Sequence, residues 1–254
     1  MSDVSYGASG AVATLTLARA HKRNALTDTM LQDMRSHVQQ ALATPSVRVL
    51  VLAADGPAFC AGADLAAVEM GERDSFANSA AASLAALLSE LLDFDKPVVC
   101  RVQGPVAGGG NGLLAASDVV IASASASFAL REVRIGVAPA VIAVPLLRRL
   151  HPGAVRDLML SGRSIDAEEA RSVGLVNRVV EPAELDAAVE RAVGELLLAG
   201  PHAQAATKRL LRELPGLDRS TAFARAVEVS VERFTSDEAT EGIAAFLEKR
   251  SPSW

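Results

Sequence analysis

The sequence lacks several features that would assign it to a specialised class of protein. It has only two cysteines, Cys60 and Cys100, which make neither a disulfide scaffold nor a zinc site. We interpret both as buried thiols in a reducing compartment. The net charge of −5 gives no excess of positive charge for binding nucleic acid. The four histidines show no spacing typical of metal ligands, so we expect no metal.

Signals for membrane insertion and export are also missing. The longest purely apolar run, Val137 to Leu147, is too short to cross a membrane and contains two prolines. The first ten residues have no basic start followed by an apolar core, so we expect a cytoplasmic protein. The 254 residues are 50% apolar, which is ordinary globular composition and enough for one large domain or a domain with an appendage.

Strand and helix patterns alternate through the first two-thirds of the chain. We predict strands in AVATLTLAR (11–19), VRVLVLAAD (47–55), KPVVCRVQG (96–104), DVVIAS (118–123) and SFAL (127–130). Helices are predicted after Thr27, over residues 73–93 and after the glycines at 108–110. From Pro139 onward helices dominate, with LVNRVVE (175–181) as the one strand. This order indicates an α/β fold with a helical tail.

The segment GPVAGGGNGLLAASD, residues 104–118, places Gly108, Gly109 and Gly110 between a predicted strand and a helix. Glycine has no Cβ, so the backbone here can come close to a ligand. The first N–H groups of a helix have no partner inside it and lie at the positive end of its dipole. They can hold an anion or a negative charge that develops during a reaction. Close packing of the helix on the strand would need the same glycines and stays open as the alternative.

Three ligands fit such a glycine run. A nucleotide phosphate in a P-loop requires a lysine and a hydroxyl residue after the last glycine, where Leu113 and Leu114 stand. A dinucleotide requires glycine or alanine at Leu113 and an acidic residue after the next strand, which has IASAS instead. The third ligand is the oxygen of a polarised carbonyl.

A second loop favours the carbonyl. FCAGADL, residues 59–65, also follows a predicted buried strand and leads into a helix, with Asp64 near the start of that helix. Two such loops, each offering a backbone N–H, supply what an oxyanion hole for a thioester needs.

Six segments, in this order, resemble the crotonase family, also called the enoyl-CoA hydratase/isomerase family. They are LARAHKRNALT, FCAGADL, KPVVCRVQGPVAGGGNGLLAASDVVIAS, FALREVRIGVAPA, LSGRSIDAEEARSVGLVNRVV and SDEATEGIAAFLEKR. The resemblance covers nearly the whole chain. It implies a crotonase-like ββα spiral core with the CoA and oxyanion site over residues 1–198. It also implies a C-terminal helical trimerisation region over residues 199–254.

The resemblance also implies roles for individual residues. The N–H groups of Ala63 and Gly109 would bind the thioester oxygen, and Glu132 would be the catalytic acid and base. Hydratases of the family hold a water between two glutamates, and the position of the first is Gly112 here. We therefore expect an acyl-CoA enzyme with a single catalytic glutamate, a lyase first and an isomerase next. A hydrolase, a decarboxylase or a non-catalytic acyl-CoA binder of the same fold stays open.

For the CoA part of the substrate, the resemblance points to two places. One is Lys22 and Arg23 for the phosphates, together with the loop residues Ala61, Asp64, Leu65 and Gly108. The other is Phe246 and Lys249, which match residues that the family supplies to a neighbouring subunit's CoA; a core phenylalanine and a surface lysine are the alternative. We expect no cofactor beyond the CoA of the substrate. We expect a trimer or a dimer of trimers, because stripes such as Ala222, Ala226 and Val229, and Ile243 with Phe246, need partners.

Other polar residues near these motifs have weaker assignments. We interpret Asp118 as structural, bonding the neighbouring backbone. Asn111 could orient a water or simply cap a turn. One of Glu69, Glu72 and Asp74 could replace the missing acid, although a solvated helix face is the preferred interpretation.

Overall fold

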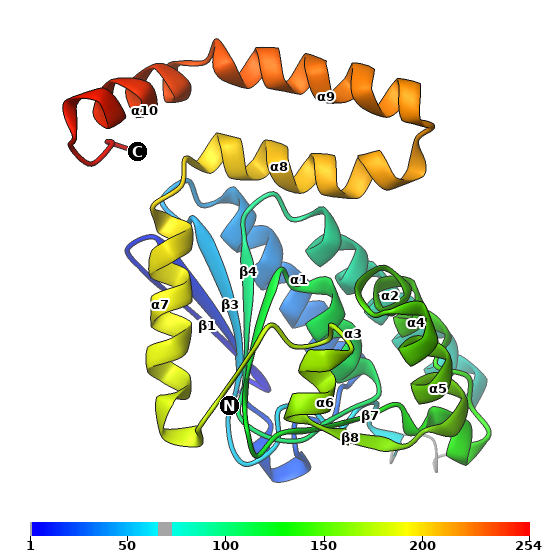
Figure 1. The fold of residues 1–254 in the computed structure, drawn as a ribbon. Coiled ribbons are helices and arrows are strands. Elements are labelled where there is room, and N and C mark those ends of the chain that lie inside the picture. Colours follow the sequence, from blue (N-terminus) through cyan, green and yellow to red (C-terminus); the bar gives the residue numbers. More distant parts are fainter. Residues whose placement is uncertain (1, 66–72) are drawn as a thin grey trace.

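A central six-stranded sheet organises the chain, whose computed structural model describes residues 2–65 and 73–254 (Figure 1). Its strand order is β1-β2-β3-β4-β6-β9, with an antiparallel β1–β2 pair and parallel pairs elsewhere. The strands are β1 (Val4–Ser9), β2 (Val12–Leu17), β3 (Val49–Ala54), β4 (Val98–Val102), β6 (Val119–Ser123) and β9 (Arg178–Val180). A smaller sheet has the order β5-β7-β8, from β5 (Val106–Ala107), β7 (Ser127–Ala129) and β8 (Ser164–Asp166).

The central strands are buried on both faces, which explains their continuous apolar sequence. In β3, Leu50 and Leu52 belong to the large core, whereas Val49 and Val51 belong to a second core beneath α7 (Leu185–Leu197). Helix α7 supplies that second core with Leu185, Ala188, Val189, Ala192 and Val193. Alternate residues of one strand therefore serve two different layers.

Helices cover the other face of the sheet and the glycine segment. Helix α1 (Asp28–Ala43) begins after Thr27, whose hydroxyl accepts a hydrogen bond from the N–H of Met30 at 3.2 Å. Helix α3 (Gly109–Ala116) is buried along its whole length and packs against α2 (Arg73–Asp93) and α4 (Ala140–Arg149). The remaining elements before the tail are α5 (Pro152–Ser161), α6 (Ala167–Ser172) and the 3₁₀ turns η1 (Ala20–Lys22), η3 (Arg131–Ile135) and η4 (Pro182–Glu184).

The C-terminal helices extend past the edge of this core (Figure 1). They are α8 (Pro201–Glu213), α9 (Arg219–Phe234) and α10 (Asp237–Glu248), with the turn η5 (Leu214–Gly216) between the first two. The Glu238 carboxylate of α10 accepts hydrogen bonds from the N–H groups of His202 and Ala203 at 2.9 and 2.8 Å, so it caps α8. The boundary predicted after residue 198 falls between α7 and α8, but the division into two domains stays a prediction.

Most expected elements are confirmed, and three short strands were missed. Strand β1 precedes the first predicted strand, β5 precedes the glycine helix, and β8 follows Pro139, so the expectation of one strand there is wrong. Strands β5 and β8 are two and three residues long and exist through pairing with β7, which local sequence does not reveal. No helix among the described residues is long and apolar enough to cross a membrane.

The expected apolar stripe on α9 also needs correction. Val229 is buried, and Ala222 and Ala226 are half-buried, so these residues pack against the chain itself. The exposed face of α9 instead carries the large apolar side chains Phe223, Val227, Val231 and Phe234. These four residues recur at helical spacing, so they form one continuous stripe, which we call the α9 stripe.

The glycines of α3 allow a test of how tightly this helix is packed. A Cβ on Gly110 would lie 2.8 Å from the Cβ of Cys60 and 2.9 Å from Cγ1 of Val106, both fully buried residues. We expect Gly110→Ala to lower the free energy of unfolding in urea by about 1–3 kcal/mol through overpacking.

Gly194→Ala on α7 is the matched control, because a Cβ there would meet nothing within 4 Å. It should raise the free energy of unfolding by about 0.4–1 kcal/mol, since alanine restricts the unfolded chain. Equal effects of the two substitutions would contradict tight packing at Gly110.

Candidate functional site

Two loops that leave neighbouring parallel strands lie side by side. The loop after β3 and the loop after β4 are joined by hydrogen bonds from the N–H of Phe59 to the carbonyl of Pro105 at 3.0 Å and from Ala107 to Cys60 at 2.8 Å. Because β3 and β4 are parallel neighbours, their carboxyl ends meet at one edge of the sheet, where ligands of α/β proteins bind. The two motifs that the sequence singled out therefore meet in space.

The two loops also approach each other closely at Gly62 and Gly108. A Cβ on Gly108 would lie 3.3 Å from Cα of Gly62, and a Cβ on Gly62 would lie 3.4 Å from the carbonyl oxygen of Ala107. Both glycines have positive φ angles, +91° at Gly62 and +50° at Gly108, which other residues rarely adopt. Each position therefore favours glycine for two reasons, the positive φ angle and the lack of room for a Cβ.

The next residue in each loop offers a backbone donor. Ala63 follows Gly62, and Gly109 follows Gly108 as the first residue of α3. Within residues 2–65 and 73–254, neither N–H group donates a backbone hydrogen bond. Two free donors that follow touching glycines are suited to a negatively charged oxygen, and the dipole of α3 adds to this at Gly109.

Glu132 lies at the same junction. It belongs to the turn η3, and its Oε1 would be 3.3 Å from a Cβ on Gly108. Its Oε2 is buried and has no hydrogen-bond partner among the described residues. Burial raises the pKa of Glu132 above its ordinary value of 4.5. The structure therefore brings the predicted acid, half-buried and free to exchange a proton, next to the predicted oxyanion loops.

The backbone before Glu132 is fixed to the glycine loop. The N–H of Gly108 donates to the carbonyl of Ala129 at 3.2 Å, and the Asn111 amide donates to the same carbonyl at 3.0 Å. Strands β5 and β7 also pair Ala107 with Ala129. Of the two interpretations of Asn111, a structural role is the one that these contacts support.

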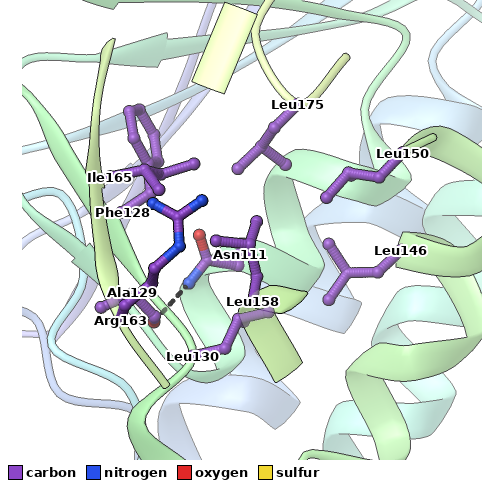
Figure 2. A pocket seen from close by; sticks show the side chains of 10 residues that line it. All are labelled: Asn111, Phe128, Ala129, Leu130, Leu146, Leu150, Leu158, Arg163, Ile165 and Leu175. Atoms are coloured by element: carbon purple, nitrogen blue, oxygen red, sulfur yellow. Dashed lines mark hydrogen bonds between the residues drawn. The ribbon is translucent and has the colours of Figure 1, made fainter. Parts of the chain in front are cut away.

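A cavity beside Asn111 is too small for a substrate. It has a volume of about 10 Å³, which is room for one water at most. Figure 2 shows the side chains that surround it, which are mostly apolar but include Arg163, with the Asn111 amide directed toward Ala129. An open cleft of about 400 Å³, lined by Thr16, Asp55, Arg101 and Asp186 among others, contains none of the predicted site residues.

Sequence reasoning missed Asn24, which fixes the predicted CoA segment. Asn24 is fully buried with a φ of +55°, and its amide donates to the carbonyls of Asp55 and Ala58, both at 2.9 Å. The N–H of Ala61 donates to the neighbouring carbonyl of Arg23 at 2.9 Å. Asparagine adopts positive φ angles more often than most other residues do. Asn24 could therefore have been recognised from the sequence as a candidate for a left-handed turn.

The residues expected to bind CoA lie in two separate places. Lys22 and Arg23 are exposed beside the first oxyanion loop, where Ala61 and Leu65 are also exposed. Asp64 forms an ion pair with Arg19 at 2.7 Å, a contact that the sequence did not predict. These residues form one surface next to the candidate oxyanion hole.

Phe246 and Lys249 lie at the far end of the chain. They belong to α10 and its C-terminal cap, well away from α3 in Figure 1. Phe246 is 81% exposed, so it is not a core phenylalanine. A single chain does not bring them to the site, and their contribution to a neighbour stays a prediction.

The structure gives different outcomes for the remaining polar residues and the thiol that the sequence singled out. Asp118 is structural as expected, because it accepts a hydrogen bond from the N–H of Val98 at 2.7 Å and pairs with Lys208 at 2.6 Å. The thiol of Cys60 is fully buried, and burial raises its pKa to about 12, which excludes a thiolate nucleophile. Glu69, Glu72 and the Asp74 side chain lie outside the described residues.

Comparison with known proteins agrees with this geometry. The family described as enoyl-CoA hydratase/isomerase matches residues 7–254. The chain belongs to this family. The crotonase fold expected from the sequence is therefore confirmed, and the protein is an enzyme of a family that acts on acyl-CoA thioesters.

Individual relatives are similar over almost their full lengths. A Thermus thermophilus relative is 35% identical over 247 residues, which cover 96% of this chain and 97% of the relative. A carnitinyl-CoA dehydratase from Proteus mirabilis is 34% identical, covering 96% and 95%. The crystal structure of an enoyl-CoA hydratase from Shewanella pealeana superposes with a TM-score of 0.94 at 34% identity, covering 100% of this chain and 96% of that one.

The raised pKa of Glu132 predicts how stability depends on pH. The folded protein keeps a proton on Glu132 at higher pH than the unfolded chain does, so the ionised carboxylate lowers stability above the raised pKa. This loss disappears as the pH falls below the unfolded value of 4.5. Glu132→Gln should therefore raise the melting temperature near neutral pH and have no such effect below that value.

Glu190→Gln, on the exposed side of α7, is the control and should change the melting temperature little at either pH. If Glu132→Gln lowered the melting temperature near neutral pH, the carboxylate would be stabilised in the fold and its burial would not be a cost.

Proposed function

We propose that this enzyme stabilises the enolate of an acyl-CoA thioester, with Glu132 as its single acid and base. In this proposal the N–H groups of Ala63 and Gly109 bind the thioester oxygen. The observation that carries it is the position of the Glu132 carboxylate beside Gly108, where the two loops touch. An acid, two donors and a surface for CoA then belong to one site.

The chemistry follows from where charge develops. Polarisation of the carbonyl makes C2 acidic and C3 electrophilic, and the oxygen gains negative charge as the enolate forms. Preorganised donors stabilise that charge, and the loss of one typically costs about a hundred- to a thousandfold in rate. A partly buried carboxylate with a raised pKa is suited to take a proton from carbon and return it. Proton transfer changes no oxidation state, so the reaction balances without a cofactor beyond the CoA of the substrate.

Two reactions can follow enolate formation. The Proteus mirabilis relative is named a dehydratase and the Shewanella pealeana structure a hydratase, and both names support addition or removal of water. Gly112, where a second carboxylate would be expected, supports movement of a proton along the acyl chain instead. A non-catalytic acyl-CoA binder is disfavoured, because such a protein would have no use for a buried acid next to the donor loops.

The CoA moiety would bind at the surface formed by Lys22, Arg23, Ala61 and Leu65. The two exposed cations suit the phosphates, and the exposed loop backbone suits the adenine. Phe246 and Lys249 would complete the site of a neighbouring subunit, since both are exposed and remote in their own chain. A cytoplasmic location is part of the proposal and is supported by the two buried free thiols.

Replacement of the acid should separate catalysis from binding. Glu132→Gln keeps the size of the side chain but cannot exchange a proton, so kcat should fall by about a hundred- to ten-thousandfold. Binding of a non-reactive acyl-CoA, measured by calorimetry, should change little, because it depends on the CoA surface and the donor loops.

A panel of 2-enoyl- and 3-enoyl-CoA esters of different lengths, with products identified by mass, supplies the substrate for this test. Glu190→Gln is again the control. A Glu132→Gln enzyme within about tenfold of the parent rate would show that another group carries the proton.

The protein should assemble through its C-terminal helices into a trimer or a dimer of trimers. The α9 stripe exposes Phe223 at 68% and Phe234 at 74%, and a second copy of the chain would cover such a face. Val227→Asp should dissociate the assembly in light scattering at micromolar concentration, whereas Thr221→Asp, exposed in the first turn of the same helix and away from the stripe, should not. A monomeric parent protein would refute this assembly.

A further inference from the structure

Leu26, which lies between the Asn24 turn and helix α1, contacts both proposed donor loops. It is 3% exposed and belongs to the large core. The chain is held on both sides of it, because the Asn24 amide bonds the carbonyls of Asp55 and Ala58 and Thr27 caps α1. The backbone of Leu26 is therefore fixed in place before α1 begins.

The backbone of Leu26 sets the direction of the Ala63 donor. Its N–H donates to the carbonyl of Gly62 at 2.7 Å, and its carbonyl accepts from the N–H of Asp64 at 2.9 Å, so Leu26 and Ala63 form a parallel bridge. The carbonyl of Gly62 and the N–H of Ala63 belong to one trans peptide unit and point in opposite directions. Because that carbonyl points at Leu26, the N–H of Ala63 points away from it and stays available to a ligand.

The side chain of Leu26 packs on the other donor. A Cβ on Gly109 would lie 3.0 Å from Cδ1 of Leu26 and 3.3 Å from Cδ2 of Leu84, so these two leucines cover the Cα of Gly109. Gly109 is the first residue of α3, and its N–H is the second proposed donor. Leu26 therefore connects the backbone of the first loop to the start of the helix that follows the second loop.

The second leucine reaches Gly109 from α2. The Asp28 carboxylate, at the start of α1, accepts hydrogen bonds from the hydroxyls of Ser79 and Ser83 and so holds α2 against α1 next to Leu84. Leu84 lies inside α2, where its backbone is bonded within the helix, so it offers Gly109 a side chain alone. Leu26 differs from it in holding the first loop as well.

We propose that Leu26 is a positioning residue of the oxyanion hole, which joins the Ala63 donor through its backbone to the Gly109 donor through its side chain. This rests on the proposed enolate chemistry. The two donors serve one oxygen, and a misplacement of about 1 Å can cost about a hundredfold in rate. The role of Leu26 is to fix the separation of the donors, and proton transfer is left to Glu132.

The carbonyl of a bound acyl-CoA reports on both donors directly. Butyryl-CoA with ¹³C at the thioester carbonyl should show a lower C=O stretching frequency in difference infrared spectra when bound to the parent than in water, because two donors polarise the bond. Leu26→Ala keeps the backbone bridge but removes the contact with Gly109. It should return the frequency at least about half-way to its value in water and lower kcat at least about tenfold. Calorimetric binding of butyryl-CoA should change less than about threefold, because it depends mainly on the CoA surface.

Three further variants separate this role from packing. Leu26→Met conserves volume and should restore both the parent frequency and the parent kcat. Leu91→Ala, fully buried in the same core two turns beyond Leu84 on α2, should lower the melting temperature as Leu26→Ala does but leave the frequency unchanged. Leu84→Ala opens the same space beside Gly109 but keeps the Leu26 link, so it should change the frequency and kcat less. Equal effects of Leu84→Ala and Leu26→Ala would overturn the inference.

The two proposals fail in different ways. If the parent does not lower the carbonyl frequency of bound butyryl-CoA, the proposed oxyanion hole is wrong, and the role of Leu26 falls with it. If the parent lowers it and a folded Leu26→Ala lowers it equally, only the role of Leu26 is refuted. Should melting curves show that Leu26→Ala does not fold, Leu26→Val, which loses Cδ1 at a smaller cost to stability, decides the question by the same frequency.

Discussion

The contact between Gly62 and Gly108 is the constraint on which the rest of the site depends. A side chain at either position would be strained by the positive φ angle and crowded, because its Cβ would lie 3.3–3.4 Å from the opposite loop. Ala63 and Gly109, whose N–H groups are the proposed donors, directly follow these two glycines. Glu132 reaches the same point because its Oε1 also lies against Gly108. The contact between Gly62 and Gly108 thus positions both the proposed donors and the proposed acid.

The order of the strands makes this contact possible. β3 and β4 are parallel neighbours, so the loops that follow them emerge at the same edge of the sheet. The N–H groups of Phe59 and Ala107 donate hydrogen bonds to the opposite loop. These bonds hold the two loops together just before Gly62 and Gly108 in the chain. Asn24 adds a third segment, because it ties the Lys22–Arg23 turn to the carbonyls after β3. The proposed CoA surface and the proposed donors therefore share one scaffold.

Local residue types predicted some parts of this arrangement and not others. The two glycine loops, α1 with its Thr27 cap and the buried strands follow from short-range patterns, and all were found. The short strands β5 and β8 depend on pairing with β7, which only the folded chain provides. The proximity of Ile142 to Gly112 was equally hidden, because it arises only when α4 packs on α3. The absence of a carboxylate at position 112 was visible in the sequence, whereas the side chain that packs beside it was not.

The surroundings of Glu132 affect the pKa of its carboxylate and its strength as a base. Removal of water raises the pKa of the carboxylate, because its charge is poorly solvated and its Oε2 has no partner among the described residues. A carboxylate with a raised pKa is a stronger base toward carbon and returns the proton readily. Ile142 and Leu88, each 2% exposed, add hydrocarbon beside Gly112. In the proposed reaction, a partly buried carboxylate with a raised pKa therefore suits proton transfer to and from carbon.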